Sequence, residues 1–434
     1  MSVLPKEINY SQRPISLPKN TQCISCVVAP SNGGSFGESQ QIQFDLPSRG
    51  YLVPDSIYLR YKQTWGASTA GSVRAIPLYT PIQRLETIIG ASVVESITNY
   101  NQLMNMLVNC RMNIAQKVGV ASNFGIGGTN IATAVAPAVL ATAFTLANVN
   151  GRGLVAGGDN FTVAGPLGCI LSNCETLYPL KYSPAIRIQL TTDSISNMCT
   201  ATALPASLAL TNLELCFDVI EFNQEVDNAV ASMVDERGKI MIKSQSYLSS
   251  GQNIAQSSVG SLEYIYNFRL ASIKSLFCHL SGTHANSINK FLDSLDVTNN
   301  NGAYQFFIAS SPYPPRPIST VLNKSGVLME LSGAFGPAHD LLTTNFGIYP
   351  DEFQALNIST TTIASMGKFY LACNTERLSS QGVMLSGVSS QNSPISLRID
   401  INTATSNTQV AQLIALFDAV IEIDIANKQV SVLQ

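Results

Sequence analysis

Charged residues are scarce in this sequence. They make up 12% of the 434 residues, which is about half the usual charged fraction of a soluble domain. The net charge is −3. No run of Lys or Arg occurs, so nothing would neutralise successive phosphates, and we expect no direct binding to nucleic acid. A surface rich in Ser, Thr, Asn and Gln suits a protein that buries much of its outside against copies of itself.

Histidine is rarer still, and the only three are His279, His284 and His339. A zinc or cupin-type site on a β-barrel needs two or three converging His ligands, and the spacing here suggests no convergence. Cys278 and His279 are neighbours on a predicted strand, so their side chains point to opposite faces and cannot act as nucleophile and base.

The nine cysteines are scattered singly, and an odd number cannot all pair. Cys23 and Cys26 form a CxxC pair, but no second CxxC or spaced His pair completes a metal site, and Cys169 and Cys174 fit no pairing motif. We expect reduced, mostly buried thiols. The first residues, MSVLPKEINYSQRP, lack the apolar core of a signal peptide, which agrees with assembly in a reducing compartment of a host cell.

Other chemical motifs are incomplete. The glycine-rich runs 125–130 and 157–160 lack the Lys-Ser/Thr of a phosphate loop and the strand-then-helix setting of a dinucleotide site. Asn-x-Ser/Thr matches at Asn160, Asn323 and Asn357 carry no weight in a protein that never meets the glycosylation machinery. Residues 131–149 are apolar and uncharged, but they are mostly Ala and Thr with Pro137 in the middle, which favours a loop or β-excursion over a membrane helix.

Glu86 and Glu95 lie on neighbouring predicted strands and resemble the paired carboxylates of a glycosidase. Alternation instead predicts single acids on the wet face of half-buried strands, and Trp65, the only tryptophan, makes no platform for sugar. The sequence therefore predicts no catalytic, cofactor-binding or metal-binding residue and no cofactor, and we expect a protein that is not an enzyme.

Strand patterns fill both halves of the chain, whose length fits two β-domains. Alternation at 41–46 and 57–62 predicts half-buried strands, and hairpins are predicted at 84–97, around Gly90, and at 421–433, around Asn427. Helical spacing is limited to three places. One helix of about five turns is predicted from Thr98 or Asn99 to about Val118. A second runs through 225–237 to Gly238, and a short patch spans 288–295.

An internal repeat is the sharpest signal. SPAIRIQLTT (183–192) resembles SPISLRIDINT (393–403), and CFDVIEF (216–222) resembles LFDAVIEI (416–423). The two pairs occur in the same order and at nearly the same offset, so the chain contains two homologous β-halves. We predict an extended, proline-containing arm at 1–34, a first half at 35–222, a helical connector at 223–238 and a second half at 239–434.

These segments resemble the double jelly-roll major capsid proteins of polinton-like viruses, virophages and related double-stranded DNA viruses. Residues 78–109, with the step ESITNYN from strand into helix, are similar to that family's strand, hairpin and helix unit. Residues 46–61, 304–320, 386–401 and 417–430 resemble its other strands. The resemblance extends over about 35–432 and is poorest at 119–165 and 341–366.

The resemblance implies an all-β fold of two tandem eight-stranded jelly-roll sandwiches with a few short helices. It also implies a pseudo-hexagonal homotrimer that tiles the icosahedral capsid of a virion, alongside penton and minor capsid proteins. An internal membrane stays open but is not indicated. We expect the arm to reach a neighbouring capsomer and residues 119–150 to lie at the trimer centre. Two alternatives stay open, namely a penton or minor capsid protein and a lectin-like tandem β-sandwich.

Overall fold

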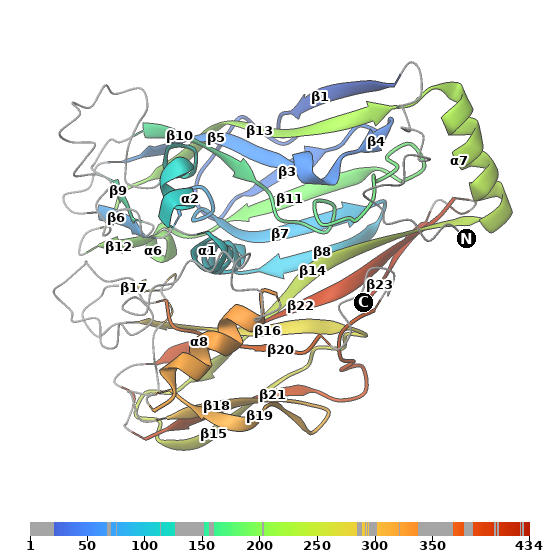
Figure 1. Cartoon of the computed structure of the whole chain (residues 1–434). Coiled ribbons are helices and arrows are strands. Elements are labelled where there is room, and N and C mark those ends of the chain that lie inside the picture. The colour runs from blue at the N-terminus through green and yellow to red at the C-terminus, as the bar shows by residue number, and fades with distance from the viewer. Residues whose placement is uncertain are drawn as a thin grey trace, which may run out of the picture.

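The computed structural model describes residues 21–66, 71–74, 76–112, 114–125, 152–155, 160–201, 204–283, 289–290, 292, 294, 302–320, 322–336, 368–376, 385–402, 405, 408–425, 427 and 429–434. Within these described residues the strands form five antiparallel sheets, and the four largest follow one another as layers from one end of the molecule to the other (Figure 1).

The first half contains the following elements: β1 (Gln22–Val28), β2 (Ser35–Phe36), β3 (Gln41–Asp45), β4 (Tyr51–Leu52), η2 (Pro54–Ser56), β5 (Tyr58–Trp65), β6 (Gly71–Arg74), β7 (Ile82–Ile89), β8 (Ser92–Thr98), α1 (Tyr100–Arg111), α2 (Ile114–Gly119), α3 (Ala121–Phe124), β9 (Arg152–Val155), β10 (Asn160–Pro166), β11 (Ile186–Thr192), α6 (Ile195–Met198), β12 (Cys199–Ala201) and β13 (Leu208–Glu221).

Helix α7 (Gln224–Arg237) leads to the second half, which contains the following elements: β14 (Lys239–Ile254), β15 (Gly260–Tyr266), β16 (Ile273–Thr283), β17 (Asn289–Lys290), β18 (Ala303–Ile308), β19 (Ser311–Ser319), α8 (Lys324–Gly333), β20 (Tyr370–Asn374), β21 (Ile395–Ile401), β22 (Gln409–Asp424) and β23 (Gln429–Leu433).

The two halves share one strand order. The first half has sheets β1-β13-β5-β10 and β3-β11-β7-β8, and the second has β14-β22-β16-β20 and β15-β21-β18-β19. If the eight main strands of each half are counted along the chain, both halves read 1-8-3-6 and 2-7-4-5. This is the predicted pair of eight-stranded jelly-rolls. The repeat found in the sequence is confirmed, because β11 and β21 are the seventh strand of their halves and β13 and β22 are the eighth.

Alternation explains why these segments form strands that face one another. In β3 the side chains of Ile42 and Phe44 are buried, and in β5 those of Leu59, Tyr61 and Trp65 are buried, while most residues between them are partly or fully exposed. Both predicted hairpins are confirmed as β7–β8 and β22–β23. Gly90 turns the first hairpin at φ +62°, a backbone angle that glycine adopts without strain.

The N-terminal boundary needs a correction. Residues 22–28 fall within the arm predicted at 1–34, but they form β1, which pairs with β13 along its whole length. The side chains of β1 are only exposed or half-buried, a pattern too weak to stand out beside the prolines. Residues 1–20 lie outside the described residues.

The helix predictions are right in part. The single helix predicted from 98 to 118 is broken, because α1 ends at Arg111 and Met112 is extended before α2 begins. Asn99 precedes α1 in a left-handed conformation and its side chain caps nothing. Helix α1 also buries Asn101, Asn105 and Asn109, so its polar residues do not mark a wet face. The connector helix is present as α7, and Gly238 follows it at φ +69°.

In the second half, residues 289–290 of the helical patch predicted at 288–295 form strand β17 instead, and most of the patch lies outside the described residues. Helix α8 was not predicted. Its signal is an Asn323 side chain that accepts a hydrogen bond from the Gly326 N–H, followed by Val327 and Leu331 on one buried face. Among the described residues, no helix is long and apolar enough to cross a membrane, and residues 131–149 lie outside them.

A close backbone approach in the second jelly-roll gives a first prediction. A Cβ on Gly387 would lie 2.1 Å from the Ile273 carbonyl oxygen, next to the bridge between Ile273 and Val388. The substitution Gly387→Ala must move backbone, so we expect unfolding in urea to be easier by about 2 kcal/mol. Gly336→Ala is the control, since a Cβ there meets nothing within 4 Å. Equal stabilities of the two variants would contradict the close approach.

Candidate functional site: the junction between the two halves

The two jelly-rolls meet where strand β14 of the second half runs beside strand β8 of the first (Figure 1). β14 is an edge strand, and its outward backbone carbonyls accept hydrogen bonds from the first half. The Glu175 N–H donates to the Lys243 oxygen at 3.0 Å, and the Asn173 side-chain amide donates to the Gln245 oxygen at 3.0 Å. Side chains and a loop therefore cover an edge that would otherwise be open to pairing with another chain.

Further contacts extend this junction along both strands. The Ser249 hydroxyl donates to the Thr98 carbonyl at 2.6 Å, and the Gln434 side chain donates to the Val94 carbonyl at 3.3 Å. Helix α1 adds the Arg111 guanidinium, 5.5 Å from the ring centre of Phe335 in the second half. Since these contacts lie at several points along the junction, they fix the orientation of one jelly-roll against the other.

Glu95 lies buried at the centre of the junction. Its carboxylate accepts hydrogen bonds from the hydroxyls of Thr87 at 2.9 Å and Ser246 at 2.5 Å, and from the Ile170 N–H at 2.8 Å. Ser246 belongs to the second half, so this one side chain joins both jelly-rolls. Burial raises the pKa of Glu95, and the three donors offset only part of that effect.

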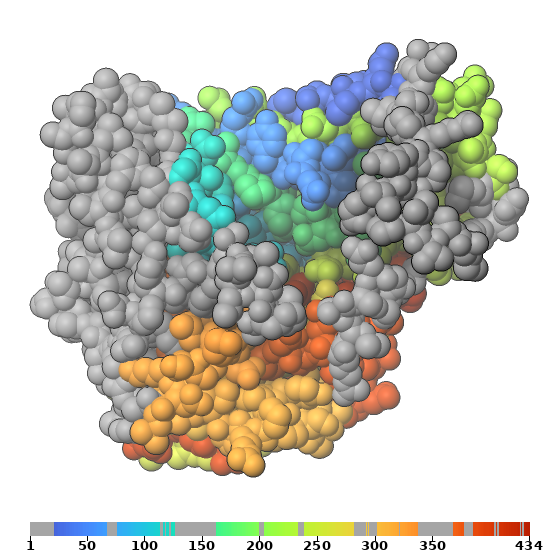
Figure 2. Space-filling view, viewed as in Figure 1, coloured from blue at the N-terminus to red at the C-terminus, as the bar shows by residue number. Residues whose placement is uncertain are grey.

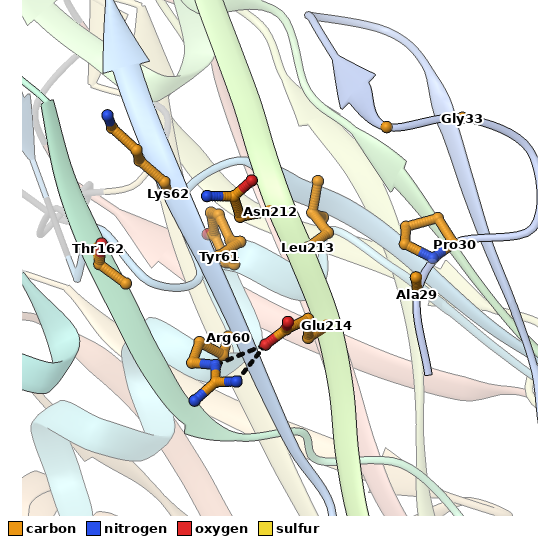
Figure 3. Close-up of a pocket in the computed structure, with 11 residues that line it drawn as sticks. Ala29, Pro30, Gly33, Arg60, Tyr61, Lys62, Thr162, Asn212, Leu213 and Glu214 are labelled. Carbon is orange, nitrogen blue, oxygen red and sulfur yellow. Dashed lines mark hydrogen bonds and ion pairs between the residues drawn. The ribbon is translucent and has the colours of Figure 1, made fainter. Parts of the chain in front are cut away.

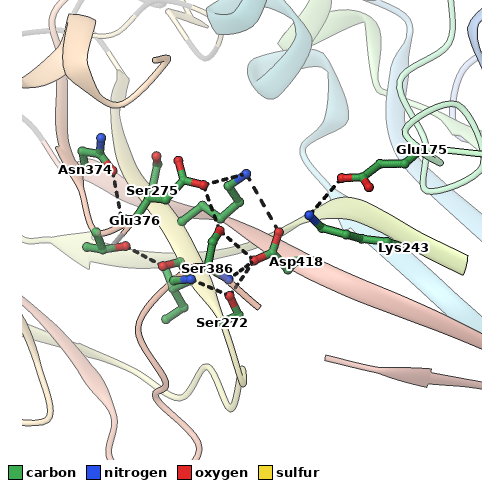
Figure 4. A network of polar contacts seen from close by, with 12 residues as sticks. Glu175, Lys243, Ser272, Ser275, Asn374, Glu376, Ser386 and Asp418 are labelled. Atoms are coloured by element: carbon green, nitrogen blue, oxygen red, sulfur yellow. Dashed lines mark hydrogen bonds and ion pairs between the residues drawn. The ribbon is translucent and has the colours of Figure 1, made fainter. Parts of the chain in front are cut away.

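A second buried carboxylate, that of Asp418, lies within the second jelly-roll, and Asp218 is its counterpart in the first. Asp418 on β22 accepts hydrogen bonds from the Ser272 hydroxyl at 2.7 Å and the Ser386 N–H at 2.8 Å, and Lys274 lies 3.9 Å away (Figure 4). The equivalent Asp218 on β13 is half-buried and accepts from the Ser25 hydroxyl at 2.6 Å.

In both halves the backbone N–H of this aspartate donates to an equivalent serine, but to a different oxygen of that serine. The Asp218 N–H donates to the hydroxyl of Ser56, and the Asp418 N–H donates to the carbonyl of Ser272. Each serine precedes the third strand of its half, and each aspartate lies on the eighth. The repeated Phe-Asp pair is visible in the sequence, but the matching Ser-Ile at 56–57 and 272–273 is too short to stand out until the strands are aligned.

The outer face of sheet β1-β13-β5-β10 carries a shallow hollow of about 450 Å³ (Figure 3). The Arg60 guanidinium pairs with the Glu214 carboxylate there, beside Lys62 and Thr162. The loop at Pro30 and Gly33 forms one wall, and a bulge of β13 near Asn212 forms another. All of these polar groups lie at the surface, so the hollow has the character of a contact surface and not of an enclosed ligand pocket.

The paired acids considered from the sequence do not converge. Glu86 lies opposite Ser96 and Thr87 lies opposite Glu95, so the two carboxylates point to opposite faces of the hairpin. The expectation that both lie on a wet face is wrong, since both are buried. Glu86 pairs with Arg84 and accepts from Gln189 at 2.9 Å, while Glu95 faces the second jelly-roll. Strand alternation alone cannot reveal a covering domain.

The histidine and tryptophan side chains show no catalytic setting in the described part of the chain. His279 is fully buried, burial lowers its pKa to about 4, and its Nε2 lies 3.4 Å from the Leu292 carbonyl. Cys278, at the preceding position, is also fully buried. Trp65 is buried and donates to the Gln63 side chain at 3.1 Å. His284 and His339 lie outside the described residues.

The cysteines considered as candidate ligands, Cys23, Cys26, Cys169 and Cys174, are free thiols. Cys23 is exposed on β1, whereas Cys169 and Cys174 are buried thiols whose pKa burial raises to about 12. Within the described part of the chain, no three His, Cys, Asp or Glu side chains form a metal-binding group. The runs 125–130 and 157–160 lie mostly outside it, as does Asn357, while Asn160 begins β10 and Asn323 caps α8.

Comparison with solved structures shows the fold. The chain is similar to the Faustovirus major capsid protein, with a TM-score of 0.62 at 10% identity over 96% of this chain and 92% of that one. It is similar to the PBCV-1 virus capsid, with 0.60 at 10% identity over 98% and 99%. For the mavirus major capsid protein the score is 0.51 at 11% identity over 100% and 95%. No family model and no curated protein matches the sequence.

These capsid proteins are double jelly-rolls, and this chain has the same all-β fold with a few short helices. At about 10% identity the likeness concerns the fold. The fold prediction made from the sequence is confirmed, including the two eight-stranded halves in tandem.

The two equivalent aspartates provide a matched pair of variants. Asp418→Ala leaves two buried donors without their acceptor and removes one of the two carboxylates near the Lys274 ammonium, so we expect a loss of about 3 kcal/mol in the free energy of unfolding. Asp218→Ala removes a half-exposed hydrogen bond and should cost about 1 kcal/mol. Urea titrations measure both. Equal losses would show that burial of Asp418 does not set its contribution.

The pH dependence of stability tests Glu95. Its folded pKa lies above the usual 4.5, so the folded chain holds the proton more tightly than the unfolded chain. Stability is therefore full below about pH 4.5 and falls as the pH rises through the folded pKa. Glu95→Gln mimics the neutral form, so its Tm minus that of the unchanged protein should increase from about pH 5 to about pH 8.

Glu95→Ala is the matched control. It leaves three donors unsatisfied at every pH, so it should be less stable than Glu95→Gln by about 2 kcal/mol at every pH, while its difference from the unchanged protein shifts with pH as that of Glu95→Gln does. A Glu95→Gln difference that stays constant with pH would contradict the raised pKa.

Proposed function

We propose that this chain is a viral major capsid protein that assembles as pseudo-hexagonal homotrimers, which tile the icosahedral shell of a double-stranded DNA virus. One observation carries the proposal, namely that two jelly-rolls of identical strand order are locked into one rigid unit by the junction at β8 and β14. Three copies of such a unit present six similar sandwiches around one axis, while only threefold symmetry is needed.

The residues that recur in both halves fit a structural role and not a catalytic one. The repeated residues are strand formers and strand-connecting serines and aspartates, and none of them forms a shared reactive group. The sparse charge also fits a shell subunit, since interface cores are poor in Lys, Glu and Asp. The proposed location is the virion, and the proposed partners are other copies of the chain, a penton protein and minor capsid proteins.

Assembly in a reducing compartment of the host cell is part of the proposal. The buried cysteines Cys110, Cys169, Cys174, Cys216, Cys278 and Cys373 are free thiols. Burial raises the pKa of the Cys169 and Cys174 thiols to about 12, which keeps them protonated and unreactive.

Two further roles concern segments outside the described residues. Residues 1–20 of the arm precede β1 and are proposed to reach a neighbouring capsomer, and the segment 119–150, whose residues 126–150 lie outside the described ones, is proposed to lie at the trimer centre. The proposed domain limits follow the strands, with β1 to β13 as the first half, α7 as the connector and β14 onward as the second half.

The mass of the purified protein in native mass spectrometry tests the trimer. We expect a species of three times 46.5 kDa, with six-sided particles in negative stain. A fivefold species would indicate a penton protein. A stable monomer whose Tm rises with added sugar would indicate a lectin-like protein, and either result would contradict the proposal.

Deleting residues 1–20 tests the arm separately. β1 begins at Gln22, so the sandwich stays intact and the trimer should still form. We expect the truncated trimer to lose the ability to close shells in an assembly reaction observed by electron microscopy. Closed shells at the normal yield would show that the arm is not needed.

A further inference from the structure

An amine and a carboxyl group face each other inside the second jelly-roll. The Lys274 Nζ atom lies 3.9 Å from the Asp418 Oδ1 atom, and Asp418 is fully buried. Their strands β16 and β22, the third and the eighth of this half, are neighbours in one sheet. The space-filling view shows this half as one body, with the orange segment around α8 packed against the red segment near the end of the chain (Figure 2). The two groups therefore lie close together within a packed domain.

A β-bulge directs Lys274 toward this interior. Ile273 lies opposite Phe417, and Ser275 lies opposite the next residue of β22, Leu416. Lys274 is therefore the extra residue of the bulge, and its side chain is only 15% exposed although both of its neighbours are buried. A bulge places a side chain where strict alternation would not, and such bulges are common beside reactive sites.

The two oxygens of Asp418 have different surroundings. Oδ2 accepts hydrogen bonds from the Ser272 hydroxyl at 2.7 Å and from the N–H and hydroxyl of Ser386 at 2.8 and 3.1 Å (Figure 4). Within the described residues, Oδ1 makes no hydrogen bond, and it is the oxygen that faces Lys274. Three fixed donors on one oxygen stabilise the negative charge of a tetrahedral intermediate. Oδ1, which no donor holds, is then the leaving oxygen.

A second carboxylate lies beside the amine. The Glu376 Oε1 atom is 3.1 Å from Lys274 Nζ, and it accepts a hydrogen bond from the Ser386 hydroxyl at 2.8 Å. The same hydroxyl also donates to Asp418, so one serine connects the two acids. Glu376 is thus placed to take a proton from the amine and to pass it to the leaving oxygen, as a general base and acid does.

We propose that Lys274 and Asp418 form an isopeptide bond, with Glu376 as the proton carrier. Proton transfer from the Lys274 ammonium to Oδ1 of Asp418 gives a neutral amine and a neutral acid. This transfer removes two charges from a site where burial makes charge costly. The nitrogen then has to approach the carboxyl carbon to about 3.0–3.5 Å, which rotation of the flexible lysine side chain allows.

The reaction balances without a further reactant. The Lys274 nitrogen attacks the carboxyl carbon of Asp418, a C–N bond forms, and Oδ2 carries the negative charge between its three donors. Glu376 takes one proton from the nitrogen and delivers it to Oδ1. The C–Oδ1 bond breaks, one water molecule leaves, and Oδ2 becomes the amide oxygen. The nitrogen keeps its last hydrogen, and nothing is oxidised or reduced.

The first jelly-roll has the aspartate but not the amine. Tyr58 lies opposite Cys216 as Ser275 lies opposite the equivalent Leu416, so the bulge residue Lys274 has no counterpart there. The equivalent aspartate of the first half should therefore stay unlinked. In the second half the bond ties the third strand to the eighth, so this sandwich cannot open along that pair without breaking a covalent bond. The inference concerns one jelly-roll alone and does not depend on the proposed capsid role.

Intact mass and peptide mapping of the purified full chain test the bond. The linked chain should be lighter than its sequence by one water molecule. Trypsin should release residues 270–290, uncut after Lys274, joined to residues 399–428, while the peptide that contains Asp218 stays unlinked. Separate peptides at the full mass would overturn the proposal. Loss of water without the linked peptide would also overturn it, because that result indicates cyclisation at an aspartate.

Variants assign the roles of the three side chains. Lys274→Arg keeps the positive charge but not the amine, so it should have its full mass and no linked peptide. Asp418→Asn should still form the bond, with ammonia leaving in place of water. Glu376→Gln should lower the linked fraction early in expression at least about tenfold, because it removes the proton carrier. Lys243→Arg is the control, since Lys243 pairs with Glu175 and its loss should leave the linkage unchanged.

The peptide map of the unchanged chain decides the proposal even if a variant does not fold. Normal linkage in Glu376→Gln would overturn the role of Glu376, and a linked peptide in Lys274→Arg would overturn the site. A trimer that contains no linked peptide would overturn the bond and leave the proposed function in place. The loss of stability expected for Asp418→Ala refers to chains that have not formed the bond.

Discussion

The covered edge of β14 is the constraint on which the rest of the structure depends. Two similar sandwiches joined by one helix would be free to move, and neither would define a shape for a lattice. Donors from the first half form hydrogen bonds to the outward carbonyls of Lys243 and Gln245. Within the same contact the Ser246 hydroxyl donates to the Glu95 carboxylate. The junction therefore turns a duplicated sequence into a single rigid unit.

That unit uses charge in two different ways. Inside the junction one carboxylate is held by three donors, and burial shifts its pKa upward, so the contact tolerates Glu95 best when it is neutral. On the outer face of sheet β1-β13-β5-β10, Arg60 and Glu214 pair at the surface, at positions equivalent to the buried Phe277 and Ile414 of the second half. The difference follows from burial, since the junction excludes water from Glu95 whereas water reaches the Arg60 and Glu214 pair.

Much of the fold follows from the sequence because strand alternation and the repeat are local signals. The Phe-Asp pairs at 217–218 and 417–418 mark the eighth strand of each half from the amino-acid order alone. The predictions are wrong where contacts with distant parts of the chain determine burial or strand pairing. Alternation assigns Glu95 to a wet face because it cannot show a second domain, and β1 merges into the predicted arm because its pattern is faint. Helix α1 also ends at Arg111 although the apolar spacing in the sequence continues to Val118.

The most direct test of the central claim is a cryo-electron microscopy map of the purified oligomer, at a resolution that distinguishes α8 from β1. We predict three chains around one threefold axis, whose six jelly-roll halves give the particle a six-sided outline. A map with a twofold or fivefold axis in its place, or with a single chain, would contradict the account.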